Sequence, residues 1–303
     1  MIESYPLAVP PRALEYSDTI LTGAMPDEAE LTSGTRIVPG RNYGFFTDTS
    51  LCIGCKACEV ACKEWNALPA DELLLTGQSY DNTGALSATT WRHVAFVERL
   101  DMRPTEMAPF QSNWLMLSDI CKHCERAGCL EACPTGSLFR TEFGTVVVQQ
   151  DICNGCGYCV PACPFGVITL NEHDGKAHKC TLCYDRLKGG LEPACSKSCP
   201  TDSIQFGELE ELQSRAARRL ASLHARGVTD ANLYGAPDTP GTTGGIGPLH
   251  AFFLLLDRPE RYGLPVAPTL PSRRTKPALL AGVATMAGVA LAAALTFLGG
   301  RRG

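Results

Sequence analysis

The stretch that decides the fold is CKHCERAGCLEACP at residues 121–134, followed by CNGCGYCVPACP at residues 153–164. The second has the spacing C-x2-C-x2-C-x3-C-P, which is typical of the ligand run for a 4Fe–4S cluster. The first is the same run with two extra residues before its third cysteine. In a two-cluster ferredoxin, each run gives three thiolates to one cluster and its fourth to the other. The two runs therefore predict one ferredoxin-like unit.

The repeat continues beyond the cysteines. CPTGSLF at residues 133–139 and CPFGVIT at residues 163–169 match position for position, and each predicts a turn followed by a short strand. The cysteine before each proline follows a short helical stretch, which the proline ends. The interval from Cys133 to Cys153 leaves room for one short hairpin.

The chain of 303 residues contains sixteen cysteines, and all of them fall into four groups of four. Two outer groups flank the central runs, and one of them, CIGCKACEVAC at residues 52–62, is again a full run with lysine in place of the proline. The groups are Cys52, Cys55, Cys58 and Cys62; Cys121, Cys124, Cys129 and Cys133; Cys153, Cys156, Cys159 and Cys163; and Cys180, Cys183, Cys195 and Cys199.

Three kinds of cysteine chemistry could explain these groups: disulfide bonds, zinc sites and iron–sulfur clusters. A disulfide framework belongs to short secreted chains, and this chain is long and starts without a secretory signal. Zinc sites explain paired C-x2-C motifs, but neither the third cysteine of each run nor the Cys-Pro after it. Iron–sulfur clusters explain every position, so the sequence predicts four 4Fe–4S clusters.

Because the two central runs complete each other, the two outer runs are expected to form a second ferredoxin-like unit around the first. The fourth cysteine of each run then serves the cluster of its partner run. The expected ligand sets are Cys52, Cys55, Cys58 and Cys199; Cys62, Cys180, Cys183 and Cys195; Cys121, Cys124, Cys129 and Cys163; and Cys133, Cys153, Cys156 and Cys159.

The expected fold class is α+β, with two nested ferredoxin-like two-cluster units that carry insertions, followed by one transmembrane helix. Residues 1–44 are interpreted as an extended arm, either a disordered tail or an arm lying on a partner subunit. The remaining expected parts are a four-cluster domain at 45–207, with an outer unit at 45–66 plus 176–207 and an inner unit at 119–170, an extension with a linker at 208–272, and a transmembrane helix at 277–300.

Outside the cysteine runs, periodicity predicts several elements. Residues 208–226 form an amphipathic helix, since their apolar residues recur at helical spacing. Alternation predicts strands at 93–100 and 114–119, which would pair as a hairpin, and an apolar run predicts a strand at 249–256.

Five side chains lie beside the predicted ligands and could raise the reduction potentials of anionic clusters. The alternative for each of them is an ordinary solvated surface charge. They are Lys56, Lys63, Lys122, His123 and Lys179.

A stretch without charges runs from Ala278 to Gly300. A helix of this length spans roughly 34 Å, which is enough for the hydrocarbon core of a bilayer. The alternative is a buried helix of a soluble domain. The net charge of −5 with scattered basic residues gives no indication of nucleic-acid binding.

The cysteine order and several phrases resemble the iron–sulfur beta subunit of membrane-bound formate dehydrogenase, of the formate dehydrogenase-N type. The resemblance covers roughly residues 45–300, and the segment after Cys199 with the tail helix narrows it to formate dehydrogenase. The phrases are CIGCKAC (52–58), CNGCGYC (153–159), ACPFG (162–166), KCTLCYDR (179–186), EPAC (192–195) and PERYGLP (259–265).

This resemblance implies an electron-transfer subunit with no catalytic residue of its own. Its catalytic alpha partner would hold molybdenum or tungsten on a bis-pterin cofactor and oxidise formate, and a cytochrome b gamma subunit would pass the electrons to quinone. The resemblance also implies that the cluster domain lies outside the cytoplasm. The flanking charges argue the other way, because Arg273, Arg274 and Lys276 outnumber Arg301 and Arg302.

Two other functions remain open. The chain could be the relay subunit of another membrane oxidoreductase, such as a hydrogenase or a sulfur-compound reductase, since these share the cysteine pattern. It could also be a zinc-stabilised membrane adaptor without a redox role, which would be colourless.

Overall fold

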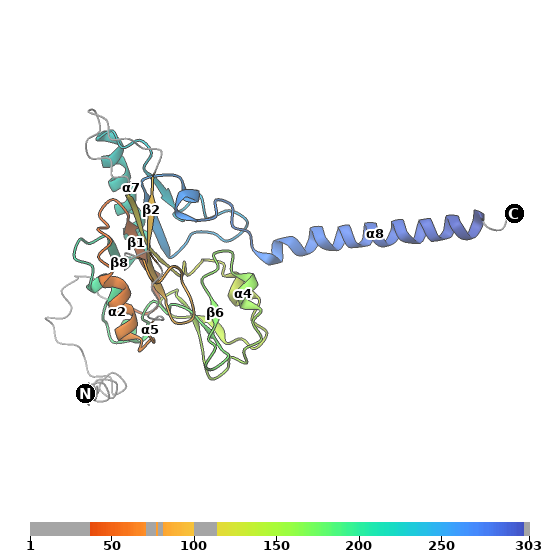
Figure 1. Cartoon of the computed structure of the whole chain (residues 1–303), viewed down its shortest axis with the longest axis horizontal. Coiled ribbons are helices and arrows are strands. Elements are labelled where there is room, and N and C mark those ends of the chain that lie inside the picture. The colour runs from red at the N-terminus through yellow and green to blue at the C-terminus, as the bar shows by residue number, and fades with distance from the viewer. Residues whose placement is uncertain (1–36, 71–76, 78–80, 100–113, 300–303) are drawn as a thin grey trace.

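The computed structural model describes residues 37–70, 77, 81–99 and 114–299. Figure 1 shows a body of short helices and small sheets, from which one long helix, α8 (Pro271–Gly299), projects. The expected arm at residues 1–44 lies largely outside the described residues.

The largest sheet has four strands in the order β8-β1-β10-β9. β1 (Tyr43–Asp48) pairs antiparallel with β8 (Ile204–Glu208) and parallel with β10 (Ala251–Leu255). The edge strand β9 (Asn232–Tyr234) pairs antiparallel with β10. The sheet thus joins the expected cluster domain to the expected extension after residue 207, and its first strand begins inside the expected arm.

Successive residues of β1 face opposite sides of this sheet, as strand geometry requires. Phe46 packs with Phe252 under α7 (Leu209–Ala225). Phe45 faces the other side, in the core cluster that includes Cys58 and Cys180. The predicted helix at 208–226 is confirmed, with its apolar face buried on the sheet at Leu209, Leu212, Ala216 and Leu223 and Leu220 partly buried.

The predicted hairpin is also confirmed. β2 (Arg92–Glu98) pairs antiparallel with β3 (Trp114–Ile120), with Val94 opposite Ser118. This two-stranded sheet places Arg92, the first residue of β2, and Ser118 of β3 beside the cysteine loops. The predicted strand at 249–256 is β10.

Four short helices, which pack in two pairs, each carry the third cysteine of a run. α3 (Gly128–Glu131) packs on α4 (Cys159–Ala162), and α2 (Ala57–Trp65) packs on α6 (Ala194–Lys197). The remaining small elements are α5 (Tyr184–Lys188) and two hairpins, β4 (Leu138–Arg140) with β5 (Val146–Val148) and β6 (Thr169–Leu170) with β7 (Ala177–His178).

The base of α8 lies against the inner pair of short helices. Pro271 and Leu270 lie next to Gly128 on α3, and the Ser272 hydroxyl donates to Glu131 at 2.8 Å. A short 3-10 helix, η2 (Pro259–Tyr262), precedes this junction. From Pro271 to Thr296 the helix is long and apolar enough to cross a membrane, and the apolar window within it has no buried residue, unlike a core helix of a soluble domain.

Candidate iron–sulfur cluster sites

All four C-x2-C loops share one backbone conformation. The residue directly before the second cysteine has a positive φ in every loop. Glycine adopts this conformation at no steric cost, whereas the other two residues there are strained by it. The four residues are Gly54 (φ 67°), His123 (φ 43°), Gly155 (φ 72°) and Leu182 (φ 58°).

The Cys-Pro turns repeat in the same way. The third residue after the cysteine has a positive φ at Gly136, Gly166 and Asp202, and each of these residues donates its N–H to the carbonyl of that cysteine at 3.3–3.5 Å. Cys62 departs from this pattern, because Lys63 replaces the proline and helix α2 continues to Trp65. Three of the four runs therefore share both the positive φ in the C-x2-C loop and the turn after the last cysteine.

The structure brings the sixteen cysteines into four places, which we call sites A to D. Site A contains Cys52, Cys55, Cys58 and Cys199, which line one cavity with Ile53, Ser118 and Thr201. Site C contains Cys121, Cys124, Cys129 and Cys163, which line a second cavity with His123 and Lys179. Site D contains Cys133, Cys153, Cys156 and Cys159, which line a third with Ser137 and Gly157.

Site B contains Cys62, Cys180, Cys183 and Cys195, and all four are buried. Burial raises the pKa of Cys62, and the negative charges of Cys180 and Cys195 raise it further. The pKa of Cys183 is raised for the same reasons, by burial first and then by Cys195, Cys180 and Cys62. The four thiols thus share one buried region, and the packing of α2 on α6 brings the helices of Cys62 and Cys195 together.

None of the sixteen thiols is in a disulfide. Burial raises the pKa of Cys58 to about 11 and of Cys180 to about 12, so a metal is needed to hold them as thiolates at neutral pH. Among the described residues, no three Cys, His, Asp or Glu side chains are arranged to hold a single metal ion. At sites A, C and D, four thiols line one cavity, three of them from one run and the fourth from its partner run, which is the ligand arrangement of a 4Fe–4S cluster in a two-cluster ferredoxin.

Hydroxyl groups lie next to several of these sulfur atoms. Ser118 Oγ lies 3.3 Å from Cys58 Sγ in site A, and Ser137 Oγ lies 3.2 Å from Cys133 Sγ in site D. Although burial raises the pKa of Cys133, hydrogen bonds with Ser137, Leu138 and Thr135 outweigh it and lower this pKa to about 6. Such donors stabilise a thiolate ligand and raise the potential of a bound cluster.

Three of the five basic side chains expected near the ligands are buried, so the interpretation as solvated surface groups is wrong for them. Lys122 and His123 are 1% exposed and Lys179 is 2% exposed. Lys179 Nζ donates to the carbonyls of Val146 and Cys180. Lysine is rarely buried in general, which is why sequence reasoning favours the surface.

The other two cations are partly exposed. Lys56 donates to Asp81 at 3.1 Å, and Lys63 donates to the carbonyls of Pro69 and Thr89. Lys56 nevertheless lines site A.

His123 fits a site that receives an anionic group. Its Nδ1 accepts the N–H of Val146 at 3.0 Å, which puts the ring proton on Nε2. The pKa of His123 lies well below its usual range, because the ring is buried and Lys179 lies near, so the ring is neutral. Its Nε2 is buried without a hydrogen-bond partner among the described residues. A buried N–H donor at site C is therefore available to sulfur.

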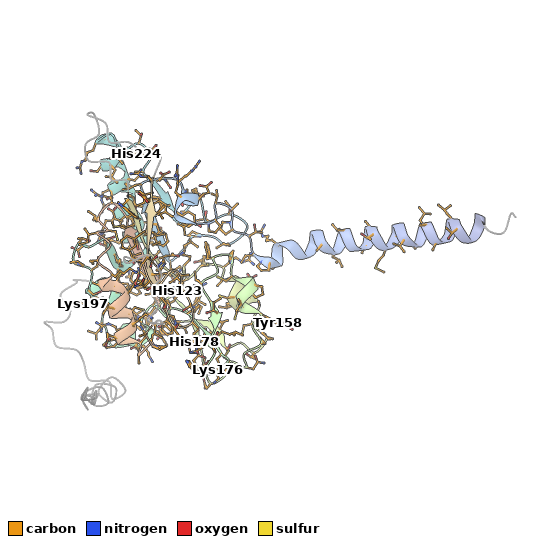
Figure 2. The ribbon with its side chains drawn as sticks, in the orientation of Figure 1. His123, Tyr158, Lys176, His178, Lys197 and His224 are labelled. Carbon is orange, nitrogen blue, oxygen red and sulfur yellow. The ribbon has the colours of Figure 1, made fainter. Side chains whose placement is uncertain are left out.

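The four sites form a row in the order A, B, C, D. Burial is the main cause of the raised pKa of Cys58, and the charge of Cys195 in site B adds to it. In the same way, Cys121 of site C acts on Cys180 of site B, and Cys159 of site D acts on Cys129 of site C. In Figure 2, Lys197, beside the cysteines of sites A and B, and Tyr158, in the loop of site D, lie at opposite sides of the body, with Tyr158 toward α8.

Comparison with known proteins shows the same cysteine-rich units. Two sequence profiles described as 4Fe-4S dicluster domains match this chain, one at residues 51–137 and the other at residues 112–209. The formate dehydrogenase iron-sulfur subunit of Haemophilus influenzae is 42% identical over 74% of this chain and 68% of its own length. The iron-sulfur subunit of the nitrate-inducible formate dehydrogenase of Escherichia coli K12 is 43% identical over 74% of this chain and 72% of its own length.

The chain belongs to the family of formate dehydrogenase iron–sulfur subunits.

The chain is also similar to a subunit of another oxidoreductase. One subunit of the anaerobic dimethyl sulfoxide reductase of Escherichia coli K12 is 36% identical over 57% of this chain and 77% of its own length. The two dicluster profiles overlap at residues 112–137 and divide the chain consecutively. They thus agree with two ferredoxin-like units of this formate dehydrogenase subunit and carry no information about nesting.

Sequence reasoning missed two residues beside sites A and B. Arg92 is 1% exposed and lies between sites A and B, and Ser118 contacts a ligand of site A. The only sequence signal was an arginine directly before the alternating strand at 93–100, which is a common pattern at strand ends.

Proposed function

We propose that this chain carries four 4Fe–4S clusters, one at each of sites A to D, and is the electron-transfer subunit of a membrane-bound formate dehydrogenase. Bound clusters would supply one-electron carriers, while the chain supplies the sixteen thiolate ligands, the hydroxyl and N–H donors to sulfur, and the buried cations. The proposed ligands are those of the four sites as defined above, and no residue of the chain is proposed to act on formate.

The observation that carries this proposal is the single row of four cysteine sites. Thiols of neighbouring sites influence each other in the pairs Cys58 with Cys195, Cys180 with Cys121, and Cys129 with Cys159. A row connects one side of the body to the other, as a relay between two partner subunits requires. A protein that used metal only for stability would have no need for four sites arranged side by side in a row.

We assign a different partner to each end of the row. Cys55 of site A is exposed, and so are Ile53 and Val60 beside it, at 59% and 60%. This end lies away from α8 (Figure 1), and we propose that the catalytic subunit with a molybdenum or tungsten bis-pterin cofactor docks there. At the other end, Cys156 of site D is exposed, and α4 of site D packs on α3 at the base of α8.

The end at site D is thus the one closest to the proposed membrane anchor. We propose that a cytochrome b subunit receives electrons there and reduces quinone. α8 would cross the membrane once, with the cluster body outside the cytoplasm and residues 301–303 inside. We also retain the nested division, in which residues 45–66 and 176–207 form an outer unit around the inner unit at 119–170.

Reduction by formate tests the function. In the complex with its pterin subunit, formate should bleach the visible absorption of the clusters as fast as the enzyme turns over. In the isolated chain, formate should leave the absorption unchanged, while dithionite should bleach it. Reduction of the isolated chain by formate would contradict the non-catalytic role.

A second candidate is the relay subunit of a sulfur-compound reductase, which the 36% identity to the dimethyl sulfoxide reductase subunit favours. The higher identity and coverage of the formate dehydrogenase subunits favour formate. Affinity purification of the intact complex separates the two, because the co-purified catalytic subunit oxidises formate in one case and reduces a sulfoxide in the other.

A further inference from the structure

Arg92, the first residue of β2, is the largest side chain that the structure buries completely. Its guanidinium carbon lies 4.9 Å from the ring centroid of Phe45. Its Nη1 donates to the Ser118 hydroxyl at 2.9 Å and to the Ser118 carbonyl at 3.3 Å. Its Nε and Nη2 are buried without any hydrogen-bond partner among the described residues.

No carboxylate forms an ion pair with Arg92 in the part of the chain that the structure describes. An unpaired guanidinium in a protein interior is costly, and each buried N–H without an acceptor adds to the cost. The charge therefore needs an anionic partner that lies next to it in the assembled protein.

The groups around Arg92 identify that partner. Burial lowers the pKa of Arg92, but the charges of Cys195, Cys58, Cys180 and Cys62 outweigh it and raise this pKa above its usual value. Cys58 belongs to site A, and the other three belong to site B. The guanidinium thus lies between two cysteine sites, with two N–H groups still available.

We propose that Arg92 is a positioning residue shared by the clusters of sites A and B, to whose sulfur atoms its Nε and Nη2 donate, and that it raises the reduction potentials of both. This inference rests on the proposed four-cluster function. A positive charge and N–H donors favour the reduced, more negative state of a cluster. One residue then raises the potentials on both sides of the electron step between sites A and B.

Lys179 provides a matched comparison at the next gap in the row. It is buried between Cys180 of site B and Cys129 of site C, and its positive charge partly offsets the rise in pKa that burial causes in both thiols. Two of its donors are already used by the carbonyls of Val146 and Cys180. Loss of its charge is expected to affect sites B and C.

The test uses the complete complex with Arg92→Gln, Arg92→Lys and Lys179→Met, and measures the four midpoint potentials by EPR-monitored redox titration. With iron content unchanged, Arg92→Gln should lower two potentials enough to change the ratio of reduced to oxidised cluster about tenfold at a fixed potential, which is 59 mV for one electron. Arg92→Lys, which keeps the charge, should lower the same two by less.

Lys179→Met should lower two potentials, of which one is also lowered in Arg92→Gln, because site B adjoins both residues. Four unchanged potentials, or four that shift equally, in Arg92→Gln with full iron content would overturn the inference, as would a larger shift in Arg92→Lys than in Arg92→Gln. Loss of iron from all sites in both Arg92 variants would also overturn it, since it would assign Arg92 to folding. An iron content of the unaltered protein below that of four clusters would instead refute the proposed function itself.

Discussion

The sulfur atom of Cys58 lies 3.3 Å from the hydroxyl oxygen of Ser118, although 60 positions of chain separate the two residues. The hairpin of β2 and β3 brings this hydroxyl to site A, where it also accepts a hydrogen bond from Arg92. The contact shows that the surroundings of a cluster site are set by elements far away in the sequence.

Replacing this hydroxyl should change the site A cluster most, with a smaller effect at site B through Arg92, which the hydroxyl helps to hold. Ser118→Ala removes a donor to a ligand sulfur, so the potential of the site A cluster should fall by about 60 mV, the equivalent of roughly 1.4 kcal/mol for one electron. Ser137→Ala removes the matching donor to Cys133 and should lower the potential of the site D cluster instead. EPR-monitored titration of both variants should show two different clusters shifted. A shift of the same cluster in both would contradict the assignment of Ser118 and Ser137 to separate sites.

The exchange of fourth ligands between runs predicts a specific result for Cys199→Ser. The cluster of site A should be lost or converted to a three-iron form, while the cluster held by Cys180, Cys183 and Cys195 should stay intact. Cys62→Ser should do the reverse. EPR spectra of both variants, compared with Cys52→Ser as a reference for site A, decide this. If Cys199→Ser alters the same signal as Cys180→Ser, the nested arrangement is wrong.

Two glycines with a positive φ, Gly155 in a C-x2-C loop and Gly166 in a Cys-Pro turn, are predicted to respond differently to substitution. A Cβ at Gly155 would meet the carbonyl oxygen of Gly175, in addition to the cost of a positive φ. A Cβ at Gly166 would meet nothing within 4 Å, so only the conformational cost of roughly 1–2 kcal/mol applies.

Thermal unfolding monitored by the visible absorption of the clusters compares the two variants. Gly155→Ala should lower the apparent unfolding temperature more than Gly166→Ala, and it should lose iron from site D first. Equal losses of stability would show that the contact with Gly175 is unimportant.

The orientation of α8 leads to a prediction about accessibility. Because the cluster body is proposed to lie outside the cytoplasm, protease added to intact spheroplasts should digest it and leave a short membrane-bound fragment. Protection until the membrane is broken would put the body in the cytoplasm, as the charges flanking the helix suggest. A known cytoplasmic enzyme serves as the control for leakage.

The sequence predicted the local elements well because their signals are local. The apolar spacing from Leu209 to Leu223 indicates α7, and alternation indicates β2 and β3. The groups of four cysteines that the structure brings together are the ones that the exchange of fourth ligands predicts, although cluster binding itself remains a prediction. The apolar helix α8 was likewise visible as an uncharged stretch long enough to cross a membrane.

Long-range features could not be predicted. β1 pairs in parallel with β10, about 200 residues further along, and no periodicity in either strand specifies that partner. The burial of Lys122, Lys179 and Arg92 depends on packing among segments from all parts of the chain. Average tendencies of lysine and arginine favour the surface, so only a structure, or an argument that anionic clusters need compensating charge, identifies these residues.

The most direct test of the central claim is the metal content of anaerobically purified protein, measured together with acid-labile sulfide. Four 4Fe–4S clusters predict about sixteen irons and about sixteen sulfides per chain. A reproducible value of about eight irons, or zinc in place of iron, would contradict the assignment of a cluster to each of sites A to D.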